Sequence, residues 1–190
     1  MKKLNSQFLS KCIEVVIFFF AAFGGFLKNI APPEEVDSTF AIGISSICTL
    51  FILLLISSMI RRKQSNENEQ KKWVFCSLIF FVITIVLSIF YKMNIDLLTF
   101  PFPPESPKAY YIAGYELTTL AEEYKKKYPL KTISEIVDEH GGLPYRDLVW
   151  TAYSIRHAKL ILLVNYLCLV LSTATMLFCL TESSFSHKEL

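Results

Sequence analysis

The chain contains 190 residues, of which 53% are apolar, 14% aromatic and 19% charged, and its mean hydropathy is +0.41. Soluble domains of this size contain about 45–50% apolar and about 25% charged residues. Nineteen basic and 17 acidic residues give a net charge of +2, so no net basic field favours direct binding to nucleic acid. The composition excludes a disordered chain, a disulfide-knit secreted module and an ordinary soluble enzyme. It predicts an all-α integral membrane protein.

Four segments are predicted to cross the membrane as helices. Crossing the hydrocarbon takes roughly 20 apolar residues in helical form, because lipid offers no partner to an open backbone group. The segment Ile13–Leu27 is interrupted by Glu14 near its start, and it reaches this length if Phe8 and Leu9 continue the helix inward. Three further segments of suitable length contain no Asp, Glu, Lys or Arg: Phe40–Ile60, Trp73–Tyr91 and Leu160–Leu180.

A signal peptide is the alternative interpretation of the first segment. Lys2 and Lys3, followed by apolar residues, have the layout of such a signal. Lys28, Asn29 and Ile30 occupy the region where a small-residue cleavage site would lie. We therefore expect the first helix to be retained.

The predicted link between the second and third helices is strongly basic. The link between the first and second helices, in contrast, holds Lys28 beside three acidic residues. Short loops rich in Lys and Arg stay in the cytoplasm, so we expect both termini and residues 61–72 to be cytoplasmic. The basic residues that form a candidate docking surface there are Arg61, Arg62, Lys63, Lys71 and Lys72.

This orientation divides the chain into three parts. Residues 1–91 contain the first three helices, and residues 160–190 contain the fourth helix and a cytoplasmic tail. Residues 92–159, called the insert below, lie on the opposite side of the membrane, in the periplasm. Nine basic and nine acidic residues in the insert do not oppose this placement, because long translocated segments largely escape the charge rule.

The insert is predicted to be small and mainly helical. Its stretch Phe100–Pro107 contains four prolines in eight residues, which predicts an extended, stiff strut. Thr119–Glu122 and Thr132–Glu135 each match a capping box. The first box predicts a helix over Leu120–Tyr128, and the second predicts a helix that stops at Gly141 and Gly142.

A third helix of the insert is predicted to begin near Pro144 or Thr151 and to run into the fourth membrane helix. Trp150 and Tyr153 would then lie at the height of the membrane interface, where aromatic side chains gather. Tyrosines are frequent in this part of the chain and fit either headgroup contact or a binding face. The candidate contact residues of the insert are Tyr110, Tyr111, Tyr115, Tyr124, Tyr128 and Trp150.

Small residues at helical spacing predict close helix packing in the membrane. Such stripes let two backbones approach, either within one subunit or between copies of the chain. Amides in membrane helices commonly hold helices together by hydrogen bonds. The candidate packing residues are Ala21 and Gly25 in the first helix, Ala41, Ser45 and Thr49 in the second, and Asn165 in the fourth.

The sequence contains no motif that predicts catalysis, a metal site or a cofactor site. Its five cysteines all fall within or at the edge of the predicted helices, without a C-x-x-C pair, and we interpret them as small apolar residues. The three histidines belong to no H-E-x-x-H pattern, and Walker-type or G-x-S-x-G loops are missing. We therefore expect a protein that is not an enzyme and that needs no cofactor.

Three features of the layout carry a resemblance to a known family. They are the short basic link Arg61–Lys72, the insert run Gly114–Tyr124, and the run Asp147–Arg156 that leads into the fourth helix. With its four predicted helices and its length, the whole chain resembles KwaA, the family of membrane subunits of the bacterial Kiwa anti-phage defence system.

The resemblance implies a sensor in the bacterial inner membrane that forms a homo-oligomer, a tetramer. It implies that the insert and the helices detect phage attachment or injection. It further implies that a cytosolic, DNA-binding effector of the KwaB type docks on the cytoplasmic face, and that the chain itself binds no nucleic acid.

Two other functions stay open. The scattered Ser and Thr of the second and fourth helices permit a pore-forming effector that depolarises the membrane. A structural membrane protein of an unrelated complex is the third possibility.

Overall fold

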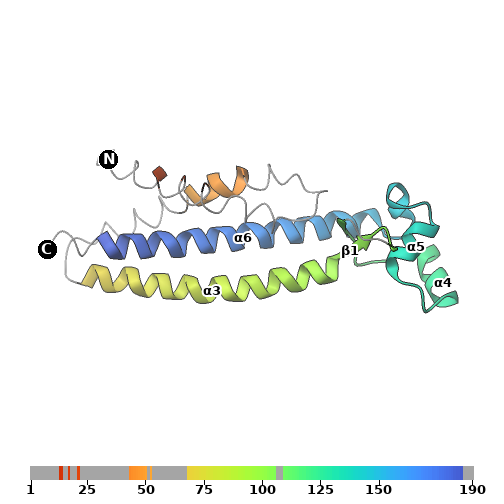
Figure 1. The fold of residues 1–190 in the computed structure, drawn as a ribbon, viewed down its shortest axis with the longest axis horizontal. Coiled ribbons are helices and arrows are strands. Elements are labelled where there is room, and N and C mark those ends of the chain that lie inside the picture. The colour runs from red at the N-terminus through yellow and green to blue at the C-terminus, as the bar shows by residue number, and fades with distance from the viewer. Residues whose placement is uncertain are drawn as a thin grey trace. The chain divides into compact units, whose positions relative to one another are not determined.

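The structure is a computed structural model that describes residues 13, 14, 17, 21, 43–50, 52, 68–105 and 109–185. These residues are mostly helical, as the composition predicted, and Figure 1 shows the long helices α3 and α6 together with shorter elements. The elements in chain order are α3 (Asn68–Leu98), β1 (Thr99–Phe102), β2 (Ala109–Ile112), α4 (Thr119–Lys127), α5 (Ile133–Glu139), the 3-10 helix η1 (Leu143–Leu148) and α6 (Ala152–Phe185).

The chain forms two compact units. Among the described residues, the first unit contains those up to 89 and those from 166 onward, and the second contains 90–105 and 109–165. The helices α3 and α6 therefore contribute to both units. All the shorter elements from β1 to η1 belong to the second unit.

The predicted third and fourth membrane-crossing segments lie within α3 and α6. Among the described residues, these two helices are long and apolar enough to cross a membrane. Their 31 and 34 residues correspond to about 46 and 51 Å at about 1.5 Å per residue. α3 extends beyond the predicted segment at both ends, and α6 includes the predicted run from the insert into the fourth segment, because it begins at Ala152. The predicted limits followed the apolar residues, whereas neither helix contains a Gly or Pro that would end it there.

The first two predicted membrane-crossing segments lie largely outside the described residues. Of Phe40–Ile60, residues 43–50 and 52 are described, and they are helical. Of Ile13–Leu27, residues 13, 14, 17 and 21 are described, also in helical conformation, and Glu14 is exposed.

The proline-rich stretch Phe100–Pro107 is not the free strut that the sequence predicted. Its first residues belong to β1, which pairs antiparallel with β2 so that Thr99 lies opposite Ile112. The insert therefore contains a hairpin and is not purely helical. Pro101 donates no hydrogen bond, but the sheet has only two strands, so each strand has an open edge where a missing N–H is tolerated. Residues 106–108 lie outside the described part of the chain.

The N-cap of α4 is Thr118, so the predicted capping box beginning at Thr119 is wrong by one residue. The Thr118 hydroxyl accepts a hydrogen bond from the amide of Ala121 at 3.3 Å and donates one to the carbonyl of Leu148 at 2.5 Å. Because Glu122 then falls one position beyond the third helical residue, it cannot complete a capping box. The choice between the two threonines depends on Leu148, 30 residues away in sequence, which a local pattern does not reveal.

The capping box of α5 is confirmed. The Thr132 side chain accepts from the amide of Glu135 at 3.4 Å, and the Glu135 carboxylate accepts from the amide of Thr132 at 2.6 Å. His140 is the C-cap, and its Nδ1 lies 2.7 Å from a carbonyl one turn back. Gly141 and Gly142 follow with φ of +99° and +80°, a conformation that costs glycine little and ends the helix as predicted.

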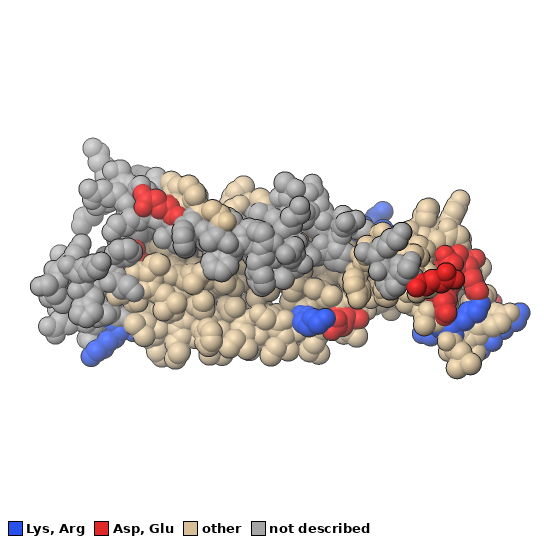
Figure 2. Space-filling model, viewed as in Figure 1, with Lys and Arg blue, Asp and Glu red and all other residues tan. Residues whose placement is uncertain are grey.

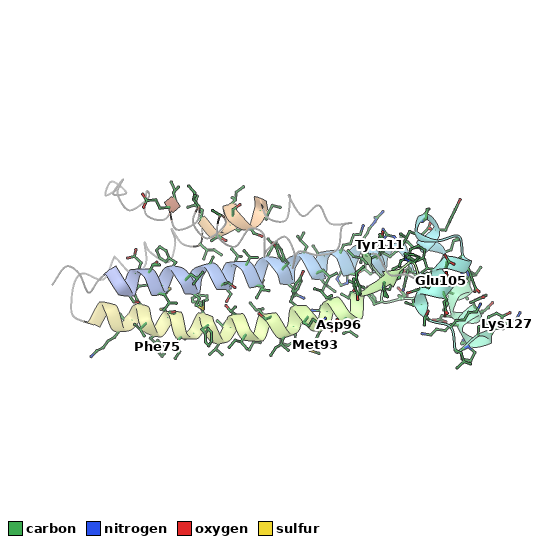
Figure 3. The ribbon with its side chains drawn as sticks, in the orientation of Figure 1. Phe75, Met93, Asp96, Glu105, Tyr111 and Lys127 are labelled. Carbon is green, nitrogen blue, oxygen red and sulfur yellow. The ribbon has the colours of Figure 1, made fainter. Side chains whose placement is uncertain are left out.

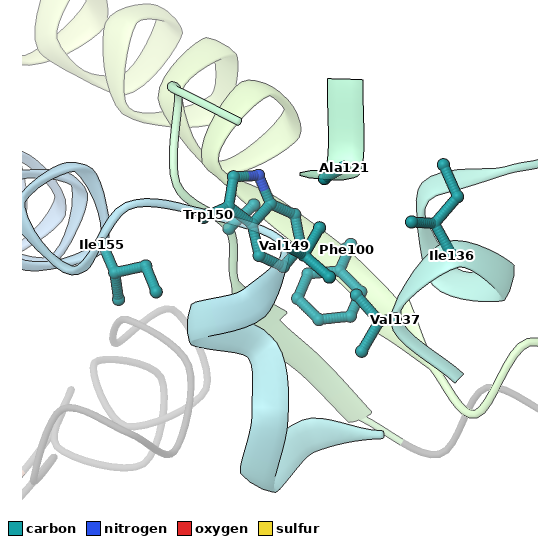
Figure 4. Close-up of a cluster of buried hydrophobic side chains, with 8 residues drawn as sticks. Phe100, Ala121, Ile136, Val137, Val149, Trp150 and Ile155 are labelled. Carbon is teal, nitrogen blue, oxygen red and sulfur yellow. The ribbon is translucent and has the colours of Figure 1, made fainter. Parts of the chain in front are cut away.

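The core of the insert forms around Trp150, which is buried rather than placed at a membrane interface as predicted. Its exposed fraction is 2%, and its ring lies 5.1 Å from the ring of Phe100 between centroids. Figure 4 shows these rings among aliphatic side chains from α5 and from the start of α6. The buried members of this cluster are Phe100, Ala113, Ala121, Ile136, Val137, Val149, Trp150 and Ile155.

Backbone hydrogen bonds join the segment before α4 to the segment before α6. The amide of Thr118 donates to the carbonyl of Val149 at 3.0 Å, and the amide of Thr151 donates to the carbonyl of Glu116 at 3.1 Å. This pairing holds Trp150 between two anchored residues. It therefore orients the indole toward the core.

α6 begins at the second of its two predicted starting points. The Thr151 hydroxyl accepts from the amide of Ser154 at 3.3 Å, as an N-cap does. Pro144, the other candidate, lies in η1, which is separated from α6 by three residues.

Gly114 lies where a side chain has no room. A Cβ atom at this position would stand 2.2 Å from the Ser154 hydroxyl oxygen and 2.7 Å from the Trp150 Cβ. The glycine thus allows the chain after β2 to pass directly against the first turn of α6.

We predict that Thr118→Val destabilises the insert and that Thr119→Val does not. Loss of an N-cap costs about 1 kcal/mol, and the valine would also leave the Leu148 carbonyl without its hydroxyl donor. Trp150 fluorescence during thermal unfolding of the full chain, in a Trp73→Phe background, measures the difference. Equal stability of the two variants would contradict the assignment of the cap.

Candidate functional site

Large apolar side chains of α3 point to the exterior. In the first unit, Phe75 is 63% exposed, Leu78 60% and Val82 54%, and Figure 3 shows Phe75 directed away from α6. Figure 2 shows an uncharged surface along α3, with charged side chains near its two ends. Apolar patches of this extent mark contact with an apolar partner or with lipid rather than with water.

Hydroxyl groups lie on the side of α3 that faces α6. In the first unit, the hydroxyls of Thr84 and Ser172 are 2.8 Å apart, and the Ser77 hydroxyl donates to the carbonyl of Met176 at 3.4 Å. The two helices are thus joined by polar contacts on their inner faces. The sequence analysis did not select Ser77 and Thr84, although their spacing of seven residues, which places them on one helix face, was a usable signal.

Only part of the predicted docking surface is described. Lys71 and Lys72 are exposed, and they lie in the first turns of α3 rather than in a link, because the helix begins at Asn68. They give the start of α3 a positive charge. Arg61, Arg62 and Lys63 lie outside the described residues.

The predicted packing residues differ in how far their side chains are buried. Ser45 and Thr49 are buried, and the Thr49 hydroxyl donates to the Ser45 carbonyl at 2.7 Å. Both side chains are thus covered by other parts of the same chain. Asn165 is half-buried on α6, whereas Ala21 is exposed. Gly25 and Ala41 lie outside the described residues.

The five tyrosines named as candidate contact residues of the insert lie in different surroundings. On β2, Tyr110 is 60% exposed, whereas Tyr111 on the opposite face packs against Phe100 with 6.3 Å between ring centroids. The other three tyrosines fall into two separate clusters, one between α4 and α5 and one at the start of α6.

The first cluster, the Tyr124 cluster, joins α4 to α5. The Tyr124 hydroxyl donates to the carboxylate of Glu139, which also forms an ion pair with Lys131. The Lys131 ammonium donates to the Tyr124 oxygen at 3.0 Å and lies 4.9 Å above the ring of Tyr128. The ring of His140 meets the Tyr124 ring edge-on at 5.1 Å. Sequence spacing did not reveal this cluster, because its members meet only when the two helices fold together.

The charges of the Tyr124 cluster stabilise one another. Hydrogen bonds from Lys131 and then from Tyr124 lower the pKa of the Glu139 carboxyl. Hydrogen bonds to Glu139, and then to Tyr124, raise the pKa of the Lys131 ammonium group. Both groups are therefore charged over a wide pH range.

The second cluster, the Tyr115 cluster, surrounds the exposed ring of His157. Tyr153 stacks on this ring with 5.8 Å between centroids and 11° between planes, and Tyr115 meets it edge-on at 5.8 Å. Tyr115 is 52% exposed and Tyr153 68%. Loss of water around its ring raises the pKa of Tyr115, and Tyr153 and Glu116 add to the effect.

A shallow groove runs beside α4. It has a volume of about 400 Å³ and combines apolar with charged side chains. Its lining residues are Leu117, Glu122, Lys125, Lys126 and Pro129.

Within the described part of the chain, no three side chains of His, Cys, Asp or Glu gather as a metal site would require. Four cysteines are described, Cys48, Cys76, Cys168 and Cys179, and all are free thiols within helices. No family model, curated protein or solved structure matches the chain.

We predict that Thr84 and Ser172 couple α3 to α6. Hydroxyl contacts between membrane helices contribute about 0.6 kcal/mol on average, so Thr84→Val and Ser172→Ala should each destabilise the protein and interact by about that amount. Unfolding of the two single variants and the double variant in mixed micelles measures the coupling energy. Ser88→Ala is the matched control, because the Ser88 hydroxyl bonds the Thr84 carbonyl within α3. Additive effects of the pair would contradict the coupling.

We predict that the contribution of Glu139 to stability disappears in acid. Its folded pKa lies below the ordinary value of 4.5, so its stabilising effect is present above pH 4.5 and is lost as the pH falls through the folded pKa. Melting temperatures of wild type and Glu139→Gln should therefore differ at neutral pH and converge at low pH. Glu123→Gln, on the neighbouring α4, should show no such convergence. A difference between wild type and Glu139→Gln that is independent of pH would contradict the prediction.

Proposed function

We propose that this chain is a non-enzymatic, multi-pass protein of the bacterial inner membrane that acts as a sensor and scaffold in anti-phage defence. In this proposal four helices cross the membrane, and the insert lies on the periplasmic side. The chain assembles with its own copies. Its cytoplasmic surface, with the basic residues between 61 and 72, recruits a cytosolic DNA-binding effector of the KwaB type.

The outward face of α3 is the observation that carries the membrane proposal. Thirteen large apolar side chains between Val74 and Leu97 are exposed on this one helix. The outer face of α3 is apolar, and its inner face carries hydroxyls. In a water-soluble protein, the polar side chains would face outward and the apolar ones would face the core. In lipid, the arrangement of α3 satisfies both faces.

The connection of the insert to the helices supports a sensing role. β1 follows α3 without an intervening residue, and only Thr151 separates the buried Trp150 from α6. A displacement of the folded insert is therefore passed to both helices without a flexible linker to absorb it.

The hydrogen bonds of the hydroxyls on α3 and α6 favour a scaffold rather than a pore as the function of the chain. Thr84 and Ser172 bond to each other, and the hydroxyls of Thr173 and Thr175 donate to carbonyls of their own helix at 2.8 and 2.7 Å. Each of these hydroxyls has a hydrogen-bond partner within the protein.

Labelling of single cysteines in intact cells tests the topology. The two reporters are Leu130→Cys in the insert, where the native residue is 98% exposed, and Lys72→Cys at the start of α3, in a background without the five native cysteines. An impermeant maleimide should label position 130 and not position 72. Labelling of position 72 alone would place the insert in the cytoplasm and overturn envelope sensing.

Charge reversal tests recruitment. Reversing Arg61, Arg62, Lys63, Lys71 and Lys72 should abolish co-purification of the product of the neighbouring gene. Reversing Lys125, Lys126 and Lys127, a basic run of the insert, is the matched control and should leave co-purification intact. Undiminished co-purification of the first variant would exclude this docking surface, and loss of membrane potential during protection would favour the pore-forming alternative.

A further inference from the structure

We propose that the Tyr115 cluster, together with the exposed Arg156, binds anionic phospholipid headgroups of the bilayer that α3 and α6 cross. The inference rests on the proposed membrane location and adds a lipid-binding surface to it. All the residues that form the surface lie in the second unit.

The position of the cluster along α6 places it at headgroup height. The apolar run Leu160–Leu180 has 21 residues and is about 31 Å long, and about 30 Å is the thickness of the hydrocarbon. His157 precedes this run by three residues, or about 4.5 Å, and Tyr153 precedes it by about 10 Å. Since the headgroup layer on each side is roughly 5–7 Å thick, the backbone of His157 lies inside it and that of Tyr153 lies roughly 3–5 Å beyond it.

α3 leaves the hydrocarbon at a matching point. Its apolar run Trp73–Tyr91 has 19 residues and is about 28 Å long. Lys92 and Asp96 follow directly and form an ion pair of 2.7 Å with side chains that are 71% and 59% exposed. The first charges on both helices therefore occur just beyond the apolar runs.

The chemistry of the cluster fits headgroups. Tyr115 and Tyr153 expose more than half of their surface, and tyrosines are favoured at membrane interfaces because the ring is apolar and the hydroxyl is wet. His157, held between them, presents ring nitrogens that can donate to a phosphate oxygen. Arg156, its neighbour, is exposed and offers a planar guanidinium suited to phosphate.

The charge balance of the surface favours an anionic headgroup over a neutral one. Lys92 is neutralised by Asp96. The carboxylate of Glu116, the nearest acidic group to Tyr115 in sequence, accepts a hydrogen bond from the Thr151 hydroxyl at 3.2 Å. Glu116 keeps its negative charge and Arg156 balances it, and Lys159, three residues further along α6, adds a positive charge.

Depth measurement in lipid nanodiscs tests the location. The full chain carries an environment-sensitive fluorophore on a single cysteine at Tyr153, at Leu130 or at Ile85, and the lipids carry spin labels at the headgroup or deep in the chains. Headgroup labels should quench position 153 strongly. They should quench position 130 weakly, because this residue lies far in sequence from the ends of α3 and α6. Deep labels should quench position 85.

The three positions separate the two proposals. Quenching at 85 with equal, weak headgroup quenching at 153 and 130 would overturn the lipid surface and leave the membrane protein intact. Absence of quenching at 85 would overturn the proposed function itself.

Retention of phosphatidylglycerol tests the charge preference. The full chain is extracted from bilayers of phosphatidylcholine and phosphatidylglycerol in roughly equal amounts, and the bound lipids are counted by native mass spectrometry. Arg156→Gln should lower the bound ratio of phosphatidylglycerol to phosphatidylcholine about fivefold, as expected for one basic residue at an anionic surface. Lys126→Gln, on α4, is the matched control and should not change the ratio. A ratio of one in wild type, or equal ratios in the two variants, would overturn the anionic preference.

Discussion

The short pairing between the chain before α4 and the chain before α6 is the contact on which the rest of the insert depends. Two backbone hydrogen bonds, from Thr118 to Val149 and from Thr151 to Glu116, fix these segments side by side. The pairing positions one threonine to cap α4 and another to cap α6. It also turns Trp150 into the core, where the indole contacts Phe100 of the hairpin. A module this small has little apolar surface to bury, so one contact that organises three elements has a large effect on its stability.

The two units of the chain expose opposite kinds of side chain. In the insert, the aromatic and aliphatic side chains are collected inside, and lysines and glutamates cover the outside. In the first unit, the outward face of α3 is apolar and the hydroxyls lie between α3 and α6. An amphipathic pattern would not have revealed this helix pair, because apolar side chains occur all around α3 and the few hydroxyls are scattered among them.

The sequence was sufficient for features that depend on neighbouring residues. The long apolar runs predicted α3 and α6, and the Thr132–Glu135 pattern predicted the start of α5. The sequence-based predictions failed where a contact with a segment distant in sequence determines the local structure. Thr118 was preferred to Thr119 because Leu148 supplies a carbonyl, and Trp150 was buried because the hairpin supplies Phe100. The Tyr124 cluster could not be predicted for the same reason, since Lys131 and Glu139 reach Tyr124 only after α4 and α5 have folded together.

The close packing at Gly114 has a consequence for the rotation of α6. The space that a side chain at Gly114 would need is taken by Trp150 and by Ser154, a small residue on the first turn of that helix. The residues on either side of Ser154 are Tyr153 and Ile155, and both are too large to occupy the same space. A turn of α6 about its own axis by one residue would drive one of them into the backbone at Gly114. The close contact at Gly114 therefore restricts the rotation of α6 about its axis to settings that place a small residue there.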